Sequence, residues 1–305
     1  MTTNGPTLSW RTGTHVSARI LCADLIWRTA NSLQPGDEIV AFDEETVRVG
    51  NANGGRRYRP GVVTHNEVRG LDSCRVVTTA DAITTSAGHR WLVRSSNVSR
   101  GPRLSLVASQ NLLPGIHRVV TVGHPWEAEN TRLAGWMAGV LDADGHAFAG
   151  GRHGSWVGFG QVDGAVLDLF LAECARRGWA TKVIRRDWTQ RKTKPLARNP
   201  RDFTDVRING GMWESCRVLG TLRPERLFPV AARMWQGAVV GKTSGDVEVL
   251  RVEQVGERPV SVISTDSRTY VAEGLLGYTA SAPHGVAHSR LSRATAAASR
   301  AARPF

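Results

Sequence analysis

Short runs of apolar and β-branched residues, separated by turn sequences, occupy residues 17–122. Examples are "ARILCADLIW", "DEIVAFDEE" and "HRWLVR", with turns such as "QPGDE" between them. This pattern is typical of short β-strands. Similar runs return over residues 246–278, in "DVEVLRVEQVG" and "RPVSVIST". The pattern therefore predicts an all-β domain in two pieces, residues 14–122 and 243–281.

Residues 126–241, between these pieces, combine helical and strand periodicity. Helices are predicted in "LAGWMAGVLDADG" and "GAVLDLFLAECARRG", and in "GMWESCRVL" and "PERLFPVAARMW" at the end; strands are predicted in "SWVGFGQV", "WATKVIRRDW" and "FTDVRING". The predicted order is α-β-β-α-β-β-α. The fold class is accordingly α+β, with a mixed domain inserted into a discontinuous all-β domain. The Ala-, Ser- and Arg-rich remainder, residues 282–305, carries no acid and predicts a basic, disordered tail.

Composition points to a globular protein with a polyanionic partner. The chain has 305 residues, 41% hydrophobic residues, 10 Trp and a formal charge of +12. Nucleic acid is the first candidate for the partner. No run approaches the ~20 apolar residues of a membrane span, and no signal peptide is visible. The four cysteines form no CxxC pair, so a cytoplasmic location without a zinc site is expected.

Basic residues are concentrated in the second pair of predicted strands and their connection. Cations on an exposed sheet gain affinity for DNA by releasing counterions from it, so these residues are predicted to contact DNA. The alternative is a solvated loop in a generally basic protein. The candidate DNA-binding residues are Lys182, Arg185, Arg186, Arg191, Lys192 and Lys194.

Two acids, Asp142 and Asp144, stand at the C-terminal end of the first predicted helix, where the helix dipole is already negative. Gly135 and Gly139 leave one stripe of this helix almost without side chains, so a second copy of the helix could approach closely. Two Asp144 carboxylates from a homodimer could then hold a divalent cation, Mg²⁺ or Mn²⁺, that serves phosphodiester hydrolysis. The alternative is a polar turn with Gly145 as the helix C-cap.

The stretch "MAGVLDADG", Met137 to Gly145, resembles the signature of LAGLIDADG homing endonucleases. The resemblance implies that Asp144 binds the metal and that Asp142 has a helix-end or interface role. It also implies that Gln161 orients the attacking water, with a plain solvent-facing strand end as the alternative. A basic residue of "TLRPERL", Arg223 or Arg226, would complete the catalytic site.

The flanking β pieces carry a second resemblance, to the Hint domains of inteins and hedgehog autoprocessing proteins. "ILCADLIWRTANSLQPGDEIVAFDEE" is similar to their opening block and "VSVISTDSRTYVAEGLLGYTAS" to their closing blocks. "AITTSAGHRWLV" is similar to their second block and supplies Ser86 and His89; the alternative for His89 is a packed core histidine. Inteins begin with Cys or Ser and end in His-Asn before a nucleophile. Here those positions fall near Thr14 and at Tyr278 to Ala280, which lack these groups.

These observations predict a site-specific, metal-dependent double-strand DNA endonuclease, a homing endonuclease, that carries a splicing-degenerate Hint domain. It would be a homodimer through the Gly135/Gly139 helix, because the chain holds one such signature, and would reside in the cytoplasm of a prokaryotic or phage-infected cell. One alternative is an active intein or other autoprocessing protein. Another is a nucleic-acid-binding protein without nuclease activity.

Overall fold

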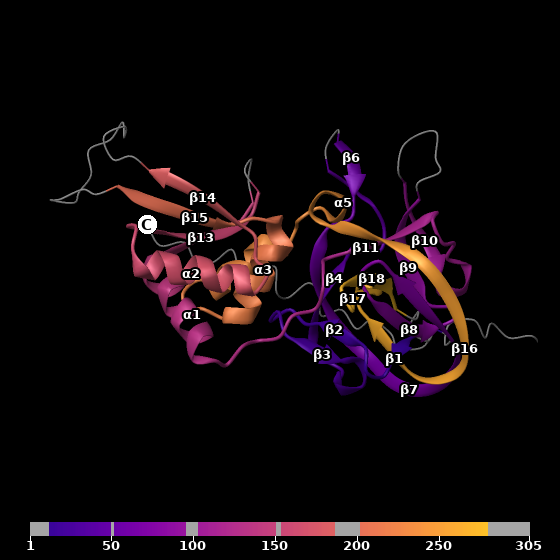
Figure 1. Cartoon of the computed structure of the whole chain (residues 1–305). Helices are drawn as coiled ribbons and strands as arrows, with labels where there is room; N and C mark the ends of the chain where they lie inside the picture. Colours follow the sequence, from indigo (N-terminus) through magenta and orange to yellow (C-terminus); the bar gives the residue numbers. More distant parts are fainter. Residues whose placement is uncertain (1–11, 50–51, 96–102, 151–153, 187–201, 280–305) are drawn as a thin grey trace, which may run out of the picture.

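A computed structural model describes residues 12–49, 52–95, 103–150, 154–186 and 202–279 of the chain (Figure 1). The described chain is mostly β, and its α-helices all fall between strands β11 and β16. The predicted tail, residues 282–305, lies outside the described residues. None of the helices in the described part of the chain has the length and apolar character needed to cross a membrane.

The largest sheet combines strands from both ends of the chain. Its order is β3-β2-β17-β18-β9-β11-β16-β1-β8-β7-β4, with β10 added to β9, while β5 and β6 form a separate pair. The bounds are β1 (Thr14–His15), β2 (Arg19–Leu21), β3 (Trp27–Thr29), β4 (Glu38–Phe42), β5 (Val47–Val49), β6 (Ala52–Gly55), β7 (Tyr58–Thr78), β8 (Ala82–Ser86), β9 (Arg90–Ser95), β10 (Arg103–Ala108), β11 (His117–Thr121), β16 (Gly245–Thr265), β17 (Thr269–Ala272) and β18 (Leu275–Tyr278). Two 3₁₀ turns, η1 (Ala30–Ser32) and η2 (Ser109–Asn111), complete this β unit.

The long strands β7 and β16 join the two pieces of the β unit. They pair antiparallel along most of their length, for example Arg69 with Val260, and curve together around the outside of the unit (Figure 1). A register shift lies between Gln254 and Gly256, where Gly256 has φ +68°. A positive φ favours glycine, so this residue permits the bulge that helps the strand pair bend.

Residues 132–243 form a second, mixed unit with a four-stranded antiparallel sheet of order β12-β13-β15-β14. Its elements are α1 (Arg132–Asp144), β12 (Gly145–Phe148), β13 (Trp156–Gln161), α2 (Ala165–Arg176), β14 (Thr181–Arg186), β15 (Phe203–Ile208), α3 (Gly211–Leu222), α4 (Phe228–Trp235) and α5 (Val240–Thr243). Helix α1 contacts β12 and β13, and helix α3 contacts β13 and β15. Val157, Phe159 and Val206, buried on that face, belong to one core with the helices.

Helix α1 follows from local sequence signals. The Thr131 hydroxyl accepts the N–H of Ala134 at 3.1 Å and caps the start of the helix. Ala134, Met137 and Leu141 are buried at helical spacing, so they form the face that packs on the sheet. At the other end a Cβ on Gly145 would lie 2.2 Å from the Leu141 oxygen. Glycine therefore allows the helix to pass directly into β12.

The elements of the mixed unit match most of those predicted from the sequence, with three differences. The predicted order has two strands between the first two helices, but residues were assigned to only one of them; the other is β12, whose "GHAF" is short and directly follows the helix. Helix α4 begins at Phe228 rather than at Pro224, since the residues before it form a separate turn. Helix α5 was not predicted.

The two units share a continuous apolar core. Trp126 Nε1 donates to the Leu25 oxygen at 3.1 Å, and Gly220 of α3 lies so close that a Cβ there would be 2.3 Å from Trp126 Nε1. On the same boundary the rings of Tyr58 and Trp213 meet edge to face at 4.9 Å. These contacts fix α3 of the mixed unit against the β unit.

Candidate functional site

Asp144 and Gln161 come together at one exposed corner of the mixed unit. Asp144 ends α1 and Gln161 ends β13, and the chain between them forms the hairpin of β12 and β13. The Gln161 Nε2 lies 3.4 Å from Asp144 Oδ2, while its Oε1 accepts the N–H of Val162 at 2.9 Å. The two residues that the sequence singled out for metal and water are therefore neighbours, and the carboxylate of Asp144 faces solvent.

The negative end of α1 is capped by Arg226. Its Nη2 donates to the main-chain oxygens of Leu141 and Gly145, at 2.9 and 2.6 Å, and its Nε donates to the oxygen of Asp142 at 2.7 Å. The Leu141 oxygen also accepts the main-chain N–H of Gly145, so the guanidinium adds donors to the carbonyls at this helix end and opposes the helix dipole. Asp142 is thus a helix-end residue, and the excess negative charge at the signature is offset within the same chain.

Arg223, the other predicted basic residue, lies elsewhere. It ends α3 in the left-handed region, with φ +50°, and its Nη1 donates to the main-chain oxygen of Asp24 in the β unit at 3.1 Å. Its guanidinium also lies 4.3 Å from the centre of the Phe228 ring. These contacts join Arg223 to the β unit and to the start of α4, and none of them is with Asp144 or Gln161.

At this corner one chain provides only part of the ligands that a divalent metal needs. Among the described residues no group of three or more His, Cys, Asp or Glu side chains is placed to hold a metal ion. The nearby Asp163 is engaged, since its Oδ1 accepts from the Thr204 hydroxyl at 2.7 Å. One chain thus offers the Asp144 carboxylate alone, and Mg²⁺ would need ligands from a second copy.

The glycines of α1 leave the helix open to such a copy. Gly135 and Gly139 are exposed, and a Cβ added at either would meet no atom within 4 Å. No described element of the chain covers this stripe. It is compatible with close approach of another helix, which is what the sequence predicted.

The basic residues of β14 are divided between the two faces of the sheet, because side chains alternate along a strand. Lys182 and Arg186 share the face opposite the helices. Arg185 points to the other face, where its guanidinium lies 4.0 Å from Asp163 and its side chain is 86% exposed. Arg185 therefore does not share a face of the sheet with Lys182 and Arg186. The remaining candidates, Arg191, Lys192 and Lys194, lie outside the described residues.

The main chain at Gly13 and Thr14 is buried in the β unit. The Ser86 hydroxyl accepts the N–H of Gly13 at 2.9 Å and lies 3.3 Å from the Gly13 oxygen, to which it can donate. Thr14 is fully buried between Thr85 and Ser261, its partners on the neighbouring strands. Ser86 therefore contacts the carbonyl of the Gly13–Thr14 peptide bond.

His89 lies in the core of the β unit. Its ring is fully buried, meets the Trp91 ring edge to face at 4.4 Å and lies 5.8 Å from Tyr270. Within the described residues neither ring nitrogen has a hydrogen-bond partner. Burial, together with the nearby charge of Arg90, lowers the pKa of His89 to about 3. The imidazole is therefore neutral at physiological pH.

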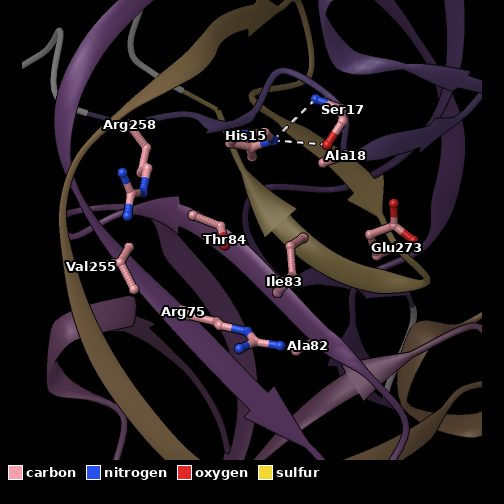
Figure 2. Close-up of a pocket in the computed structure, with 10 residues that line it drawn as sticks. All are labelled: His15, Ser17, Ala18, Arg75, Ala82, Ile83, Thr84, Val255, Arg258 and Glu273. Atoms are coloured by element: carbon pink, nitrogen blue, oxygen red, sulfur yellow. Dashed lines mark hydrogen bonds between the residues drawn. The ribbon is translucent and has the colours of Figure 1, made fainter.

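A cavity of about 470 Å³ is lined by residues of β1, β7, β8 and β16 (Figure 2). Arg75 and Arg258 bring cationic groups to it, and the Nδ1 of His15, which also lines it, is 2.8 Å from the Ser17 hydroxyl. Its one acid, Glu273, is paired with Arg19 at 2.7 Å. Thr14 is not among the residues that line this cavity, although the adjacent His15 is.

No family model matches the chain, and no curated protein does. The chain is similar in structure to several inteins. The Ssp DnaB mini-intein variant M86 is 8% identical, with a TM-score of 0.41, over 90% of this chain and 98% of its own. A DnaB intein from Synechocystis sp. PCC 6803 is 8% identical, with a TM-score of 0.39, over 88% and 98%. A bacterial intein-like domain from Clostridium thermocellum is 9% identical, with a TM-score of 0.32, over the same shares.

Proposed function

We propose that this chain is a site-specific, metal-dependent double-strand DNA endonuclease that acts as a homodimer, attached to an intein-like β unit that does not splice. The observation that carries the proposal is the meeting of Asp144 and Gln161 at the end of α1. The signature of "MAGVLDADG" and the basic strand β14 in the same unit support it.

Each residue would have a separate role. Asp144 of each copy would hold Mg²⁺ or Mn²⁺, and the metal, when bound, would stabilise charge on the phosphate and lower the pKa of water. The Gln161 amide, 3.4 Å from Asp144, would orient a water molecule beside that carboxylate. Lys182 and Arg186 on the sheet, and Arg185 beside Asp163, would contact DNA.

The homodimer supplies what one chain lacks. If the Gly135/Gly139 stripes of two copies pack together, the C-terminal ends of both α1 helices come close and bring their Asp144 carboxylates to one place. Two-fold symmetry then implies a target with two related half-sites. The Arg226 cap in each copy reduces the repulsion between the two helix ends.

The test is cleavage of a pool of randomised DNA duplexes with Mg²⁺, followed by sequencing of the ends. We expect staggered or blunt double-strand breaks at one motif, stopped by EDTA. Asp144→Asn should abolish cutting and keep DNA binding, whereas Asp168→Asn, an exposed acid on α2, should cut like the parent. Equal cutting by Asp144→Asn would contradict the assignment. Binding without cutting by the parent would instead select a nucleic-acid-binding protein without nuclease activity.

A second candidate function is self-processing at the Gly13–Thr14 bond. The contact of Ser86 with both the N–H and the oxygen of Gly13 favours it, because a donor at that carbonyl could stabilise a tetrahedral intermediate. The Thr14 hydroxyl would have to be the nucleophile. Formation of a fragment that begins at Thr14 would select this function.

A further inference from the structure

On the face of the four-stranded sheet opposite the helices, the guanidinium of Arg207 contacts both Trp156 and Asp205. Its Cζ lies 4.0 Å from the centre of the Trp156 ring. Its Nε and Nη2 both donate to Asp205 Oδ2, at 3.1 and 2.8 Å. Gly158 lies directly opposite Arg207 in the strand register. Because Gly158 has no side chain, the guanidinium has room to reach across to Trp156.

His146 extends this cluster on the neighbouring strand. Its Nε2 lies 3.4 Å from Asp205 Oδ1, and its ring meets Trp156 edge to face at 4.9 Å. Arg186 also donates to Asp205, at 3.2 Å. The Asp205 side chain is only 7% exposed, so its orientation, and with it that of Arg207, is set by the surrounding contacts.

This arrangement suits a base edge better than a phosphate. A phosphate beside Arg207 would also meet the Asp205 carboxylate, which repels it and already offsets part of the guanidinium charge. Lys182 pairs directly with Arg207 on the neighbouring strand, but it is exposed and has no ion pair among the described residues. Lys182 is therefore suited to contact a phosphate. Arg207, whose orientation is fixed by Asp205 and Trp156, is suited to recognise hydrogen-bonding groups.

We propose that Arg207 is a specificity-determining residue that recognises a guanine in the major groove of the DNA target. Its hydrogen bonds within the described chain use Nε and one proton of Nη2, which leaves the Nη1/Nη2 edge for O6 and N7 of guanine. This bidentate pairing is the commonest specific contact of arginine with a base, and the major groove admits β-structure. The proposal rests on the proposed function to the extent that this sheet face binds DNA, but it does not require cleavage.

The test is selection of binding sites from randomised duplexes by the full-length Asp144→Asn chain, which we expect to bind DNA without cutting it. We expect a guanine at a fixed position of each half-site. Adding Arg207→Met should remove the preference at that position alone and weaken binding to the selected site by roughly five- to 150-fold. Adding Lys182→Met should weaken binding to all sequences alike and reduce the slope of log K against log salt by about 1 per contact.

Two further measurements separate recognition from folding. Replacing the selected guanine with 7-deazaguanine removes the N7 acceptor, so it should weaken binding by Asp144→Asn but not by the Arg207→Met variant. Asp205→Asn removes a negative charge from the surface and loosens Arg207. It should therefore tighten binding to non-specific DNA while it reduces discrimination for guanine, and a loss of folding would not tighten binding.

An unchanged motif in the Arg207→Met variant would overturn the proposal, and so would failure of the Asp144→Asn chain to select any motif. Selection of the guanine motif by a parent chain that never cuts DNA would leave this inference supported and would contradict the nuclease function instead. Melting curves of each variant serve as the control for folding.

Discussion

Asp142 and Arg226 exchange hydrogen bonds across the end of α1. The Asp142 Oδ1 accepts the main-chain N–H of Arg226 at 2.9 Å, and Arg226 Nε donates to the main-chain oxygen of Asp142 at 2.7 Å. The other carboxylate oxygen accepts the N–H of Glu225 at 2.8 Å. Asp142 therefore anchors the turn that precedes α4, and this turn returns a positive charge to the helix end that carries Asp144.

Replacing Arg226 should disturb both stability and the site. We expect Arg226→Met to lower the free energy of unfolding by about 1–3 kcal/mol, because carbonyls at the helix end lose their donors. Arg226→Lys keeps the charge but not the planar fork, so it should recover only part of this loss. Urea unfolding at pH 7 measures the effect.

The matched control is Arg233→Met, which removes an exposed arginine from α4. Its effect should stay within about 0.5 kcal/mol of the parent. If the substitutions at 226 and 233 have equal effects, the cap does not stabilise the helix end.

Gly139→Leu should stop dimer formation without weakening the fold. The position is open in the monomer, and replacing glycine in an exposed helix removes a cost of roughly 1 kcal/mol, so the melting temperature should rise or stay unchanged. The added side chain would nevertheless keep two α1 helices apart. Sedimentation with and without DNA measures the association state.

Ala172→Leu, which places the same apolar group on exposed α2, is the control for Gly139→Leu and should associate like the parent. A dimer that survives Gly139→Leu would show that α1 is not the interface.

Local periodicity was enough to predict α1 and β13, whereas a common site for Asp144 and Gln161 was implied only by the resemblance to LAGLIDADG endonucleases. The burial of Met137 and Leu141 at helical spacing explains this success. The alternation of side chains along β14 could also have been predicted from the sequence, and it places Arg185 on the opposite face from Lys182 and Arg186.

The choice between Arg223 and Arg226 could not be made from sequence. Both lie in one short segment, and the difference is set by the left-handed backbone at Arg223, after which the chain turns back toward α1. The contact of Arg226 with Leu141 joins residues 85 positions apart. The cluster around Asp205 was missed for the same reason, since the strand register alone brings Trp156 and His146 beside it.

The buried neutral state of His89 makes the stability of the β unit depend on pH. Burial lowers the pKa of this imidazole to about 3, below the unfolded value of about 6.5, so the unfolded chain binds a proton first as pH falls. Its contribution is fully present above about pH 6.5 and is lost toward pH 3, at up to about 1.4 kcal/mol per pH unit. Urea unfolding from pH 7.5 to 4 measures this.

His89→Phe removes the titrating group, and its stability should change less with pH than that of the parent. His117→Phe, at a partly exposed histidine of β11, is the control and should follow the parent more closely. Parallel curves for His89→Phe and the parent would mean that the buried imidazole does not titrate on unfolding.

The β unit holds the Gly13–Thr14 bond in place through Ser86, but it does not provide the groups that would complete splicing. Ser86 contacts the Gly13 oxygen, but the nucleophile at this position is a buried threonine hydroxyl, whose pKa lies far above neutrality. The His89 ring nitrogens have no hydrogen-bond partner among the described residues. At the downstream end Thr279 has no amide that could cyclise.

We therefore expect that the protein neither splices nor cleaves itself. Intact-mass measurement after prolonged incubation with hydroxylamine or thiol should return the full-length chain, apart from removal of Met1. Thr14→Cys supplies a nucleophile that is far more reactive near neutral pH, so it should release a fragment ending at Gly13. Adding Ser86→Ala should slow that release, because the hydroxyl donor at the Gly13 oxygen is lost and only the main-chain N–H of residue 86, at 2.9 Å, still donates to it. A fragment ending at Gly13 from the parent, or a ligated product without the central region, would contradict the proposal and favour a self-processing protein. Cleavage that appears only with Thr14→Cys and depends on Ser86 would show that the β unit still activates this bond and that the chemistry is missing only at residue 14.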